Sequence, residues 1–203
     1  MAKIALIGAS GNAGSRILKE LSDRGHHVTA IARSPEKIAA LPNVVAKKGD
    51  VFDQAGLSKL LAGHDAVISS VHFTASDPVT LIEAVRASDV PRYLVVGGAG
   101  SLEIAPGQRV VDLPDFPADY KAEATKGAEF LDLLKQETQL DWTFLSPSAE
   151  FVPGERTGKF RIGKDNLLSN EEGSRISFED YAIALVDEIE KPQHSRQRFT
   201  VGY

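Results

Sequence analysis

The sequence predicts an α/β protein in which a doubly wound parallel sheet forms the middle layer of a three-layer αβα sandwich. Short apolar runs rich in β-branched residues alternate with amphipathic segments of helical periodicity along the chain. The segments between the runs are long enough for the crossovers that parallel strands need. A glycine-rich turn follows the first run, where such sheets bind nucleotides. We expect one domain over residues 1–203, with a small substrate-side addition at about residues 147–177.

The first apolar run, Lys3–Ile7, is followed by Gly8-Ala-Ser-Gly-Asn-Ala-Gly14 and an amphipathic segment at residues 15–24. This order predicts a strand, a tight turn and a helix whose N-terminus attracts phosphates. Gly8 can adopt a turn conformation, Gly11 lets the backbone approach a pyrophosphate, and Gly14 lets the helix pack closely on the strand. The alternative is an ordinary strand–helix turn. The predicted cofactor contacts here are Gly8, Ser10, Gly11, Asn12, Ala13 and Gly14.

A second apolar run at residues 27–32 ends in Arg33 and Ser34. In dinucleotide folds the end of this strand meets the adenosine ribose, where a carboxylate favours a free 2′-hydroxyl and an arginine accommodates a 2′-phosphate. No carboxylate stands here, so Arg33 and Ser34 predict NADP(H) in preference to NAD(H). The alternative is a solvated arginine before a helix at residues 35–40.

The third predicted strand, Val44–Lys48, is followed by Asp50 and Val51. Asp50 can accept a hydrogen bond from the adenine amino group while Val51 packs on the adenine ring. Asp50 could equally cap the helix predicted at residues 54–61.

The fourth predicted strand covers residues 65–70. Because ligands bind at the carboxyl ends of parallel strands, we expect Ser69, Ser70 and Val71 to border the cofactor ribose. His72 follows them, but a lone loop histidine is more often simply solvated, and it is not among the catalytic candidates.

A helix at residues 78–88 leads to the fifth predicted strand at residues 92–96. The small residues that follow, Gly98 among them, permit close approach of another group, which we take to be the nicotinamide. Residues 102–117 contain three prolines and no clear periodicity. A loop of this length usually binds something or covers a site, so we expect it to form part of the substrate wall.

The C-terminal third supplies the last predicted helices and strands. A periodic segment at residues 120–137 predicts a helix, and the strand at residues 140–145 places Ser146, Pro147 and Ser148 at its carboxyl end, beside the cofactor. The remaining expected elements are a short strand at residues 159–162, a capping box formed by Ser177 and Asp180, a helix at residues 181–189 and a closing strand at residues 198–201.

Composition excludes several classes of function. Hydrophobic residues make up 42% and charged residues 25%, the balance of an ordinary globular chain, and the net charge of −5 with scattered Lys and Arg argues against nucleic acid. No apolar run approaches the roughly 20 residues that cross a bilayer, so we expect a cytoplasmic protein without membrane contact. The chain has no cysteine and its five histidines form no ligand pair at helical spacing, which predicts no metal centre. The oligomeric state stays open.

Five stretches together resemble the atypical short-chain dehydrogenase/reductases. More narrowly, the chain resembles the bacterial NAD(P)H-binding proteins called "putative NADH-flavin reductases", which are related to NmrA-like proteins and to the biliverdin reductase B group. The resemblance covers essentially the whole chain and implies a Rossmann-type fold, an NADPH-type cofactor and a hydride acceptor at the strand ends. The stretches are Gly8-Ala-Ser-Gly-Asn-Ala-Gly14, Ala32-Arg-Ser-Pro35, Gly49-Asp-Val51, Trp142-Thr-Phe-Leu-Ser-Pro-Ser148 and Pro153-Gly-Glu-Arg-Thr-Gly158.

One departure from the family concerns catalysis. Short-chain dehydrogenases usually carry a tyrosine with a lysine four residues later, on one helix face, so that the ammonium lowers the pKa of the phenol. Here Tyr120 is followed at that position by Ala124, and Lys121 faces another way. Lys121 resembles in placement the single helix lysine of isoflavone-reductase-like relatives. The catalytic candidates are Lys121, Tyr120 and Ser101, although Tyr120 and Lys121 could equally be surface residues at a helix start.

These observations predict an NADPH-dependent oxidoreductase that passes hydride to a free flavin, FMN or FAD, or to a similar planar small-molecule acceptor. Such a reaction needs alignment of two rings more than an acid or base. The alternative is a non-catalytic NADP(H) sensor of the NmrA type that binds a partner protein. A dehydratase or epimerase of nucleotide sugars is a third reading, which the displaced lysine disfavours.

Overall fold

The computed structural model describes residues 1–203. Eight strands form one sheet in the order β10-β12-β8-β5-β4-β1-β2-β3. All neighbours from β12 to β3 are parallel, and β10 is antiparallel to β12. The strands are β1 (Lys3–Ile7), β2 (His27–Ala32), β3 (Val44–Lys48), β4 (Ala66–Ser69), β5 (Arg92–Val96), β8 (Asp141–Pro147), β10 (Arg161–Gly163) and β12 (Gln197–Gly202).

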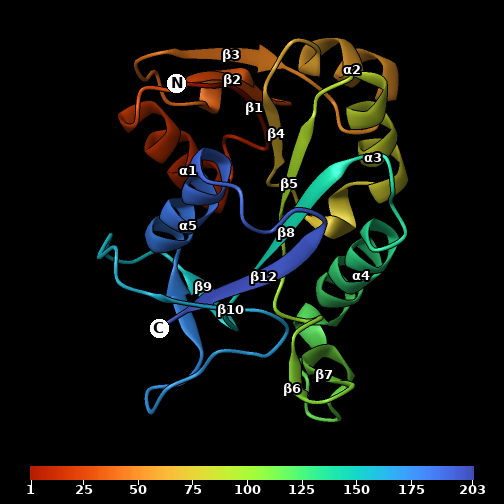
Figure 1. Cartoon of the computed structure of the whole chain (residues 1–203), viewed down its shortest axis with the longest axis vertical. Helices are drawn as coiled ribbons and strands as arrows, with labels where there is room; N and C mark the ends of the chain where they lie inside the picture. Colours follow the sequence, from red (N-terminus) through yellow and green to blue (C-terminus); the bar gives the residue numbers. More distant parts are fainter.

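Helices cover both faces of the sheet, which confirms the predicted three-layer sandwich (Figure 1). Helices α1 (Asn12–Asp23) and α5 (Phe178–Glu190) lie on one face, and α2 (Gln54–Leu61), α3 (Pro78–Ala87) and α4 (Ala118–Leu134) lie on the other. Strand residues alternate between the two layers. Ile4 and Leu6 of β1 belong to the core under α1 and α5, whereas Ala5 and Ile7 belong to the core under α2, α3 and α4.

Side-chain caps fix where three helices begin. Asp53 accepts a hydrogen bond from the Gly56 N–H at the start of α2, and Asp77 accepts one from the Thr80 N–H at the start of α3. Ser177 accepts a hydrogen bond from the Asp180 N–H, as expected of the predicted capping box. Each cap satisfies a backbone donor that has no partner within the helix.

Two predicted segments differ in the structure. The helix expected at residues 35–40 is reduced to one 3-10 turn, η1 (Pro35–Lys37), because the chain extends at Ile38, which packs against the core under α1 and α5. The segment at residues 102–117 is not an irregular loop. It forms a hairpin of β6 (Glu103–Ala105) and β7 (Gln108–Arg109) and a 3-10 turn, η3 (Val110–Asp112), and the hairpin projects from one end of the molecule (Figure 1).

The predicted C-terminal addition contains a second small sheet. Strand β9 (Glu150–Val152) pairs in parallel with β11 (Arg175–Ser177), and β10 between them in sequence joins the edge of the main sheet. One further 3-10 turn, η2 (Phe73–Ala75), follows β4. No helix in the structure combines the length and the apolar character that crossing a membrane requires.

Candidate functional site

The glycine turn after β1 has the geometry that the sequence predicts. Gly8 has φ +82°, and a Cβ atom on it would lie 2.0 Å from the carbonyl oxygen of Ser70. A Cβ atom on Gly14 would lie 2.1 Å from the carbonyl oxygen of Gly8. Side chains at these two positions would therefore force β4 and α1 away from the turn.

The N-terminus of α1 is open to a ligand. Gly11 is its N-cap residue and no side chain caps the helix, so the first N–H groups, those of Asn12, Ala13 and Gly14, have no side-chain partner. Ser10, Gly11 and Asn12 are exposed. A Cβ atom on Gly11 would meet only the carbonyl oxygens of Gly8 and Ser70, at 3.3 and 3.9 Å. These groups fit a pyrophosphate, because the helix end presents donors and positive partial charge without a competing side chain.

The chain leaving β4 runs beside this turn. Ser70 N–H donates to the Ile7 carbonyl, and the Val71 side chain would lie 3.0 Å from a Cβ atom on Gly8. Ser69 differs from its neighbours, since it is buried and its hydroxyl is 2.9 Å from the Tyr93 hydroxyl. Burial raises the pKa of Tyr93. Ser70 and Val71 therefore border the glycine turn, whereas Ser69 lies in the core beneath it.

Lys48 is a basic residue at the adenosine end of the predicted site, and the sequence analysis did not select it. Arg33 is exposed directly after β2, and Ser34 is partly exposed beside it. The register between β2 and β3 pairs Ala32 with Lys48, so exposed Lys48 lies next to the residue that precedes Arg33. Lys48 stands at the carboxyl end of a predicted strand, and this position is the signal in the sequence that could have marked it as a candidate.

Asp50 and Val51 follow β3 at the same edge. Asp50 accepts a hydrogen bond from the Phe52 N–H at 3.0 Å, and Val51 is partly buried against the core under α2. The alternative that Asp50 caps α2 is wrong, because Asp53 occupies that position. Contact of Asp50 with adenine stays a prediction.

At the predicted nicotinamide end, most of the small residues pack against the protein itself. A Cβ atom on Gly97 would lie 2.4 Å from the Phe144 ring, and one on Gly100 would lie 2.8 Å from Ala124 of α4. Gly98 is the open position, since its Cβ would meet only the ring of Phe73 at 3.6 Å. Of these three glycines, only Gly98 leaves room for the close approach of another group.

Ser146, Pro147 and Ser148 at the end of β8 are buried. The Ser148 hydroxyl donates to the Val201 carbonyl at 3.1 Å. The Ser146 hydroxyl is fully buried and has no hydrogen-bond partner in the chain. A buried hydroxyl without a hydrogen-bond partner lowers the stability of the protein. Because it is unpartnered, the Ser146 hydroxyl can form a hydrogen bond with a ligand.

The three catalytic candidates do not converge on one point. Lys121 Nζ donates to the Val111 carbonyl and lies 5.6 Å from the centre of the Phe116 ring. Ser101 is buried, and its hydroxyl oxygen accepts a hydrogen bond from Arg198 at 3.3 Å. Tyr120 is 68% exposed. A role in chemistry for these three residues stays a prediction.

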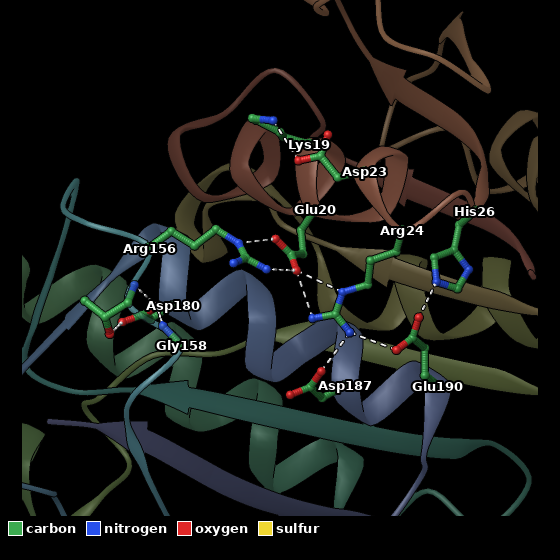
Figure 2. A network of polar contacts seen from close by, with 11 residues as sticks. Lys19, Glu20, Asp23, Arg24, His26, Arg156, Gly158, Asp180, Asp187 and Glu190 are labelled. Carbon is green, nitrogen blue, oxygen red and sulfur yellow. Dashed lines mark hydrogen bonds and ion pairs between the residues drawn. The ribbon is translucent and has the colours of Figure 1, made fainter.

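The C-terminal addition is fixed to α1 and α5 by a segment that we call the strap, residues 153–159. Arg156 donates two hydrogen bonds of 2.8 Å to Glu20, which also pairs with Arg24, and Arg24 reaches Asp187 and Glu190 (Figure 2). Burial alone raises the pKa of Glu20, but the hydrogen bonds from the two arginines outweigh it and the pKa stays below its ordinary value.

Buried Asp180 holds the other end of the strap. Its carboxylate accepts hydrogen bonds from the N–H and hydroxyl of Thr157, from the Gly158 N–H and from the Tyr203 hydroxyl, at 2.5 to 2.9 Å. The carboxylate is therefore used by the strap and does not complete the second half of the capping box. No group of three or more His, Asp or Glu side chains is placed to hold a metal ion.

Comparison with known proteins agrees with this geometry. A family model described as NAD(P)H-binding matches residues 8–192, and the chain belongs to this family of Rossmann-type NAD(P)H-binding proteins. The uncharacterized protein YwnB of Bacillus subtilis is 43% identical over 98% of this chain and 97% of its own.

Two solved structures are similar over the whole chain. A "putative epimerase" from Bacteroides thetaiotaomicron is 43% identical, with a TM-score of 0.94 over 99% of this chain and 96% of that one. A "putative NADH-flavin reductase" from Streptococcus pneumoniae is 41% identical, with a TM-score of 0.87 over 100% of this chain and 99% of that one. The predicted family is confirmed.

Proposed function

We propose that this protein is an NADPH-dependent oxidoreductase that passes hydride to a free flavin or a similar planar conjugated acceptor. The uncapped N-terminus of α1, at the carboxyl end of β1 and beside the chain leaving β4, is the observation that carries the proposal. It supports a dinucleotide lying across these strand ends. The NAD(P)H-binding family model covers the same residues.

Each part of the cofactor has a group to bind it. The first N–H groups of α1 would hold the pyrophosphate, and Arg33 with Ser34 would hold the 2′-phosphate. The open position at Gly98 and the unpartnered hydroxyl of Ser146 are available to the nicotinamide end. Bound NADPH supplies a hydride, so the task of the protein is to hold the acceptor against it. Orientation of two reactants can contribute on the order of 7 to 11 kcal/mol in favourable cases.

The catalytic candidates favour a flavin over a substrate that requires a strong acid or base. Lys121 is bonded to a carbonyl, Ser101 is bonded to Arg198, and Tyr120 has no lysine one turn later. A flavin can accept hydride at its ring nitrogen without a proton from the protein. For the same reason we do not extend the epimerase name of the Bacteroides relative to this chain, since Tyr120 has Ala124 in the place of the lysine.

Lys121 and Ser101 form hydrogen bonds within the protein, and this also favours a second candidate function. The candidate is an NADP(H) sensor of the NmrA type that binds a protein partner without catalysis. Both candidates use the same cofactor site. Both also suit the cytoplasm, where NADP(H) is held.

Turnover separates the two candidates. Purified protein mixed with NADPH and FMN, FAD or a quinone should consume the nicotinamide absorbance faster than the same mixture without protein. Calorimetry should show NADPH binding. Binding without turnover on any acceptor would contradict the enzyme, and retention of a partner protein by only one redox form of the cofactor would then support the sensor.

A further inference from the structure

The chain that follows β4 crosses the point where the strand order of the sheet reverses. Strands β2 and β3 lie on one side of β1, and β4 and β5 lie on the other. Ligands of open α/β sheets bind in the crevice outside the strand ends at such a point. Ser70 and Val71 border the glycine turn there, and the next residue is His72. Its side chain is 85% exposed, so the imidazole is accessible from solvent close to this point of the sheet.

A carboxylate of fixed position faces this imidazole. Glu123 of α4 accepts hydrogen bonds from the Phe73 N–H at 2.7 Å, the Thr74 N–H at 2.9 Å and the Thr74 hydroxyl at 2.7 Å. Its Oε1 atom lies 3.3 Å from Nδ1 of His72. Burial raises the pKa of Glu123, but these hydrogen bonds and the charge of His72 outweigh it and leave the pKa below its ordinary value. Glu123 is therefore ionised at neutral pH and held in place by three donors other than the histidine.

We propose that His72 donates a proton to the oxygen of a quinone as that acceptor is reduced, and that Glu123 is its positioning residue. The inference rests on the proposed oxidoreductase function and names the residue that would supply the proton when the acceptor is a quinone. In the imidazolium form, Nδ1–H faces Glu123 and Nε2–H lies across the ring, turned away from the carboxylate. Nε2 gives up its proton, Nδ1 keeps its own, and water reprotonates Nε2.

The reaction balances without another reactant. The quinone gains two electrons and one hydrogen as hydride and a second hydrogen as the proton from Nε2, which gives the hydroquinone and NADP⁺. Reduction of FMN to its anionic hydroquinone needs the hydride alone. The two acceptors therefore differ in whether they require the proton, and this difference isolates the role of His72.

The other candidate proton donors are less available than His72. Lys121 Nζ is bonded to the Val111 carbonyl, and Ser101 is buried against Arg198. Tyr120 precedes Glu123 by one helical turn on α4, so it lies on the same helix face but without an ionic partner of its own. Among these residues, His72 combines exposure with a carboxylate that orients it.

The test compares kcat for menadione with kcat for FMN, both with NADPH. We expect His72→Gln to lower the menadione-to-FMN ratio of kcat about 10²-fold, the lower end of what a general acid contributes. Glu123→Gln keeps the size of the side chain and should lower the ratio about tenfold. His27→Gln is the matched control, because His27 is exposed at the opposite, amino end of β2 and should leave the ratio unchanged.

Equal losses with both acceptors in His72→Gln, or no loss with menadione, would overturn the assignment of His72. Equal losses in Glu123→Gln would give Glu123 a purely structural role in η2 and overturn the positioning part. Wild-type protein that reduces FMN but not menadione overturns this inference alone. Protein that binds NADPH and reduces neither acceptor overturns the proposed function.

A second measurement needs no turnover. Diethyl pyrocarbonate acylates accessible imidazole nitrogens, and mass spectrometry identifies the modified histidine. We expect NADP⁺ with menadione to slow the modification of His72 at least severalfold and to leave that of His27 unchanged. Unchanged modification of His72 with both ligands bound would place the acceptor elsewhere and overturn the inference.

Discussion

Arg33 and Lys48 bring two positive charges to the ends of neighbouring strands. Arg33 could be selected from the sequence because it directly follows a predicted strand and no carboxylate stands there. Lys48 also ends a predicted strand, but the sequence alone does not show that it lies beside Arg33, because this follows from the pairing of Ala32 with Lys48.

Arg33→Ala should weaken NADPH binding roughly 10- to 100-fold, because a hydrogen bond to a charged group contributes about 1.5–3 kcal/mol. NADH has no 2′-phosphate, so its binding should change little. Calorimetry with each cofactor checks this, with Lys59→Ala as the control that removes an exposed positive charge from α2. Equal weakening of NADPH and NADH would contradict a role of Arg33 at the phosphate.

Other single residues show the limit of sequence interpretation. Ser69, Ser101 and Lys121 carry chemically useful groups and stand at the expected strand or helix ends. The fold gives each of them a protein partner, namely Tyr93, Arg198 and the Val111 carbonyl. Such pairings depend on tertiary contacts, which local sequence patterns do not encode.

Among the elements, α5 has two roles. Its apolar face packs on the sheet and on α1, and its first turn holds the strap through Glu179 and Asp180. Glu179 accepts a hydrogen bond from the Gly154 N–H and pairs with Arg16 of α1. The C-terminal addition is therefore attached to both α5 and α1, the helix that follows the glycine turn.

Asp180→Ala should lower the free energy of unfolding by about 3 kcal/mol, because the Thr157 and Gly158 N–H groups lose the buried carboxylate that accepts their hydrogen bonds. Asp187→Ala, on the same helix, removes a carboxylate that is 55% exposed and should cost less than about 1 kcal/mol. Urea denaturation measures both variants. If Asp180→Ala and Asp187→Ala had equal free energies of unfolding, the hydrogen bonds between Asp180 and the strap would contribute little to stability.

Elements with strong periodicity could be predicted closely, and short ones could not. The spans of β1, β2, β3, β5 and α2 agree with the sequence patterns because each is a continuous apolar run or amphipathic helix. The hairpin of β6 and β7 lacks periodicity, since its strands have two or three residues. Its Glu103 instead pairs with the backbone of Asp165 and Leu167.

For the whole molecule, stability should depend on acidic residues whose pKa values are lowered by folding. Burial raises the pKa of Glu179 and Glu190, but hydrogen bonds from Gly154 and Arg16 to the first, and from His26 and Arg24 to the second, leave both pKa values below the ordinary value of a glutamate. Burial likewise raises the pKa of Glu20, but hydrogen bonds from Arg156 and Arg24 leave it below its ordinary value. A group with a lowered folded pKa stabilises the protein fully above its unfolded pKa and loses that contribution as the pH falls through the folded value.

We therefore expect the free energy of unfolding to be nearly constant from neutral pH to about pH 5 and to fall below about pH 4.5. Urea titrations across this range measure it. Glu20→Gln should reduce the slope of that fall, because one of the shifted carboxylates is gone. A stability that stays level down to about pH 3 would contradict the assignment.

The overall α/β architecture could be predicted from the sequence. Apolar runs that alternate with amphipathic helices form a parallel sheet with helices on both faces. The contacts that attach the strap could not be predicted. Arg156 and Glu20 are 136 residues apart, and no local pattern links them.

The packing of α5 against α1 bears on the order in which the protein is assembled. Ile17, Leu18 and Leu21 of α1 share a core with Tyr181 and Leu185 of α5. During synthesis, α1 leaves the ribosome long before α5, the helix that packs against it. A nascent chain therefore carries the glycine turn long before the core that supports α1 is complete, and we expect firm binding of a nicotinamide dinucleotide only after α5 has packed.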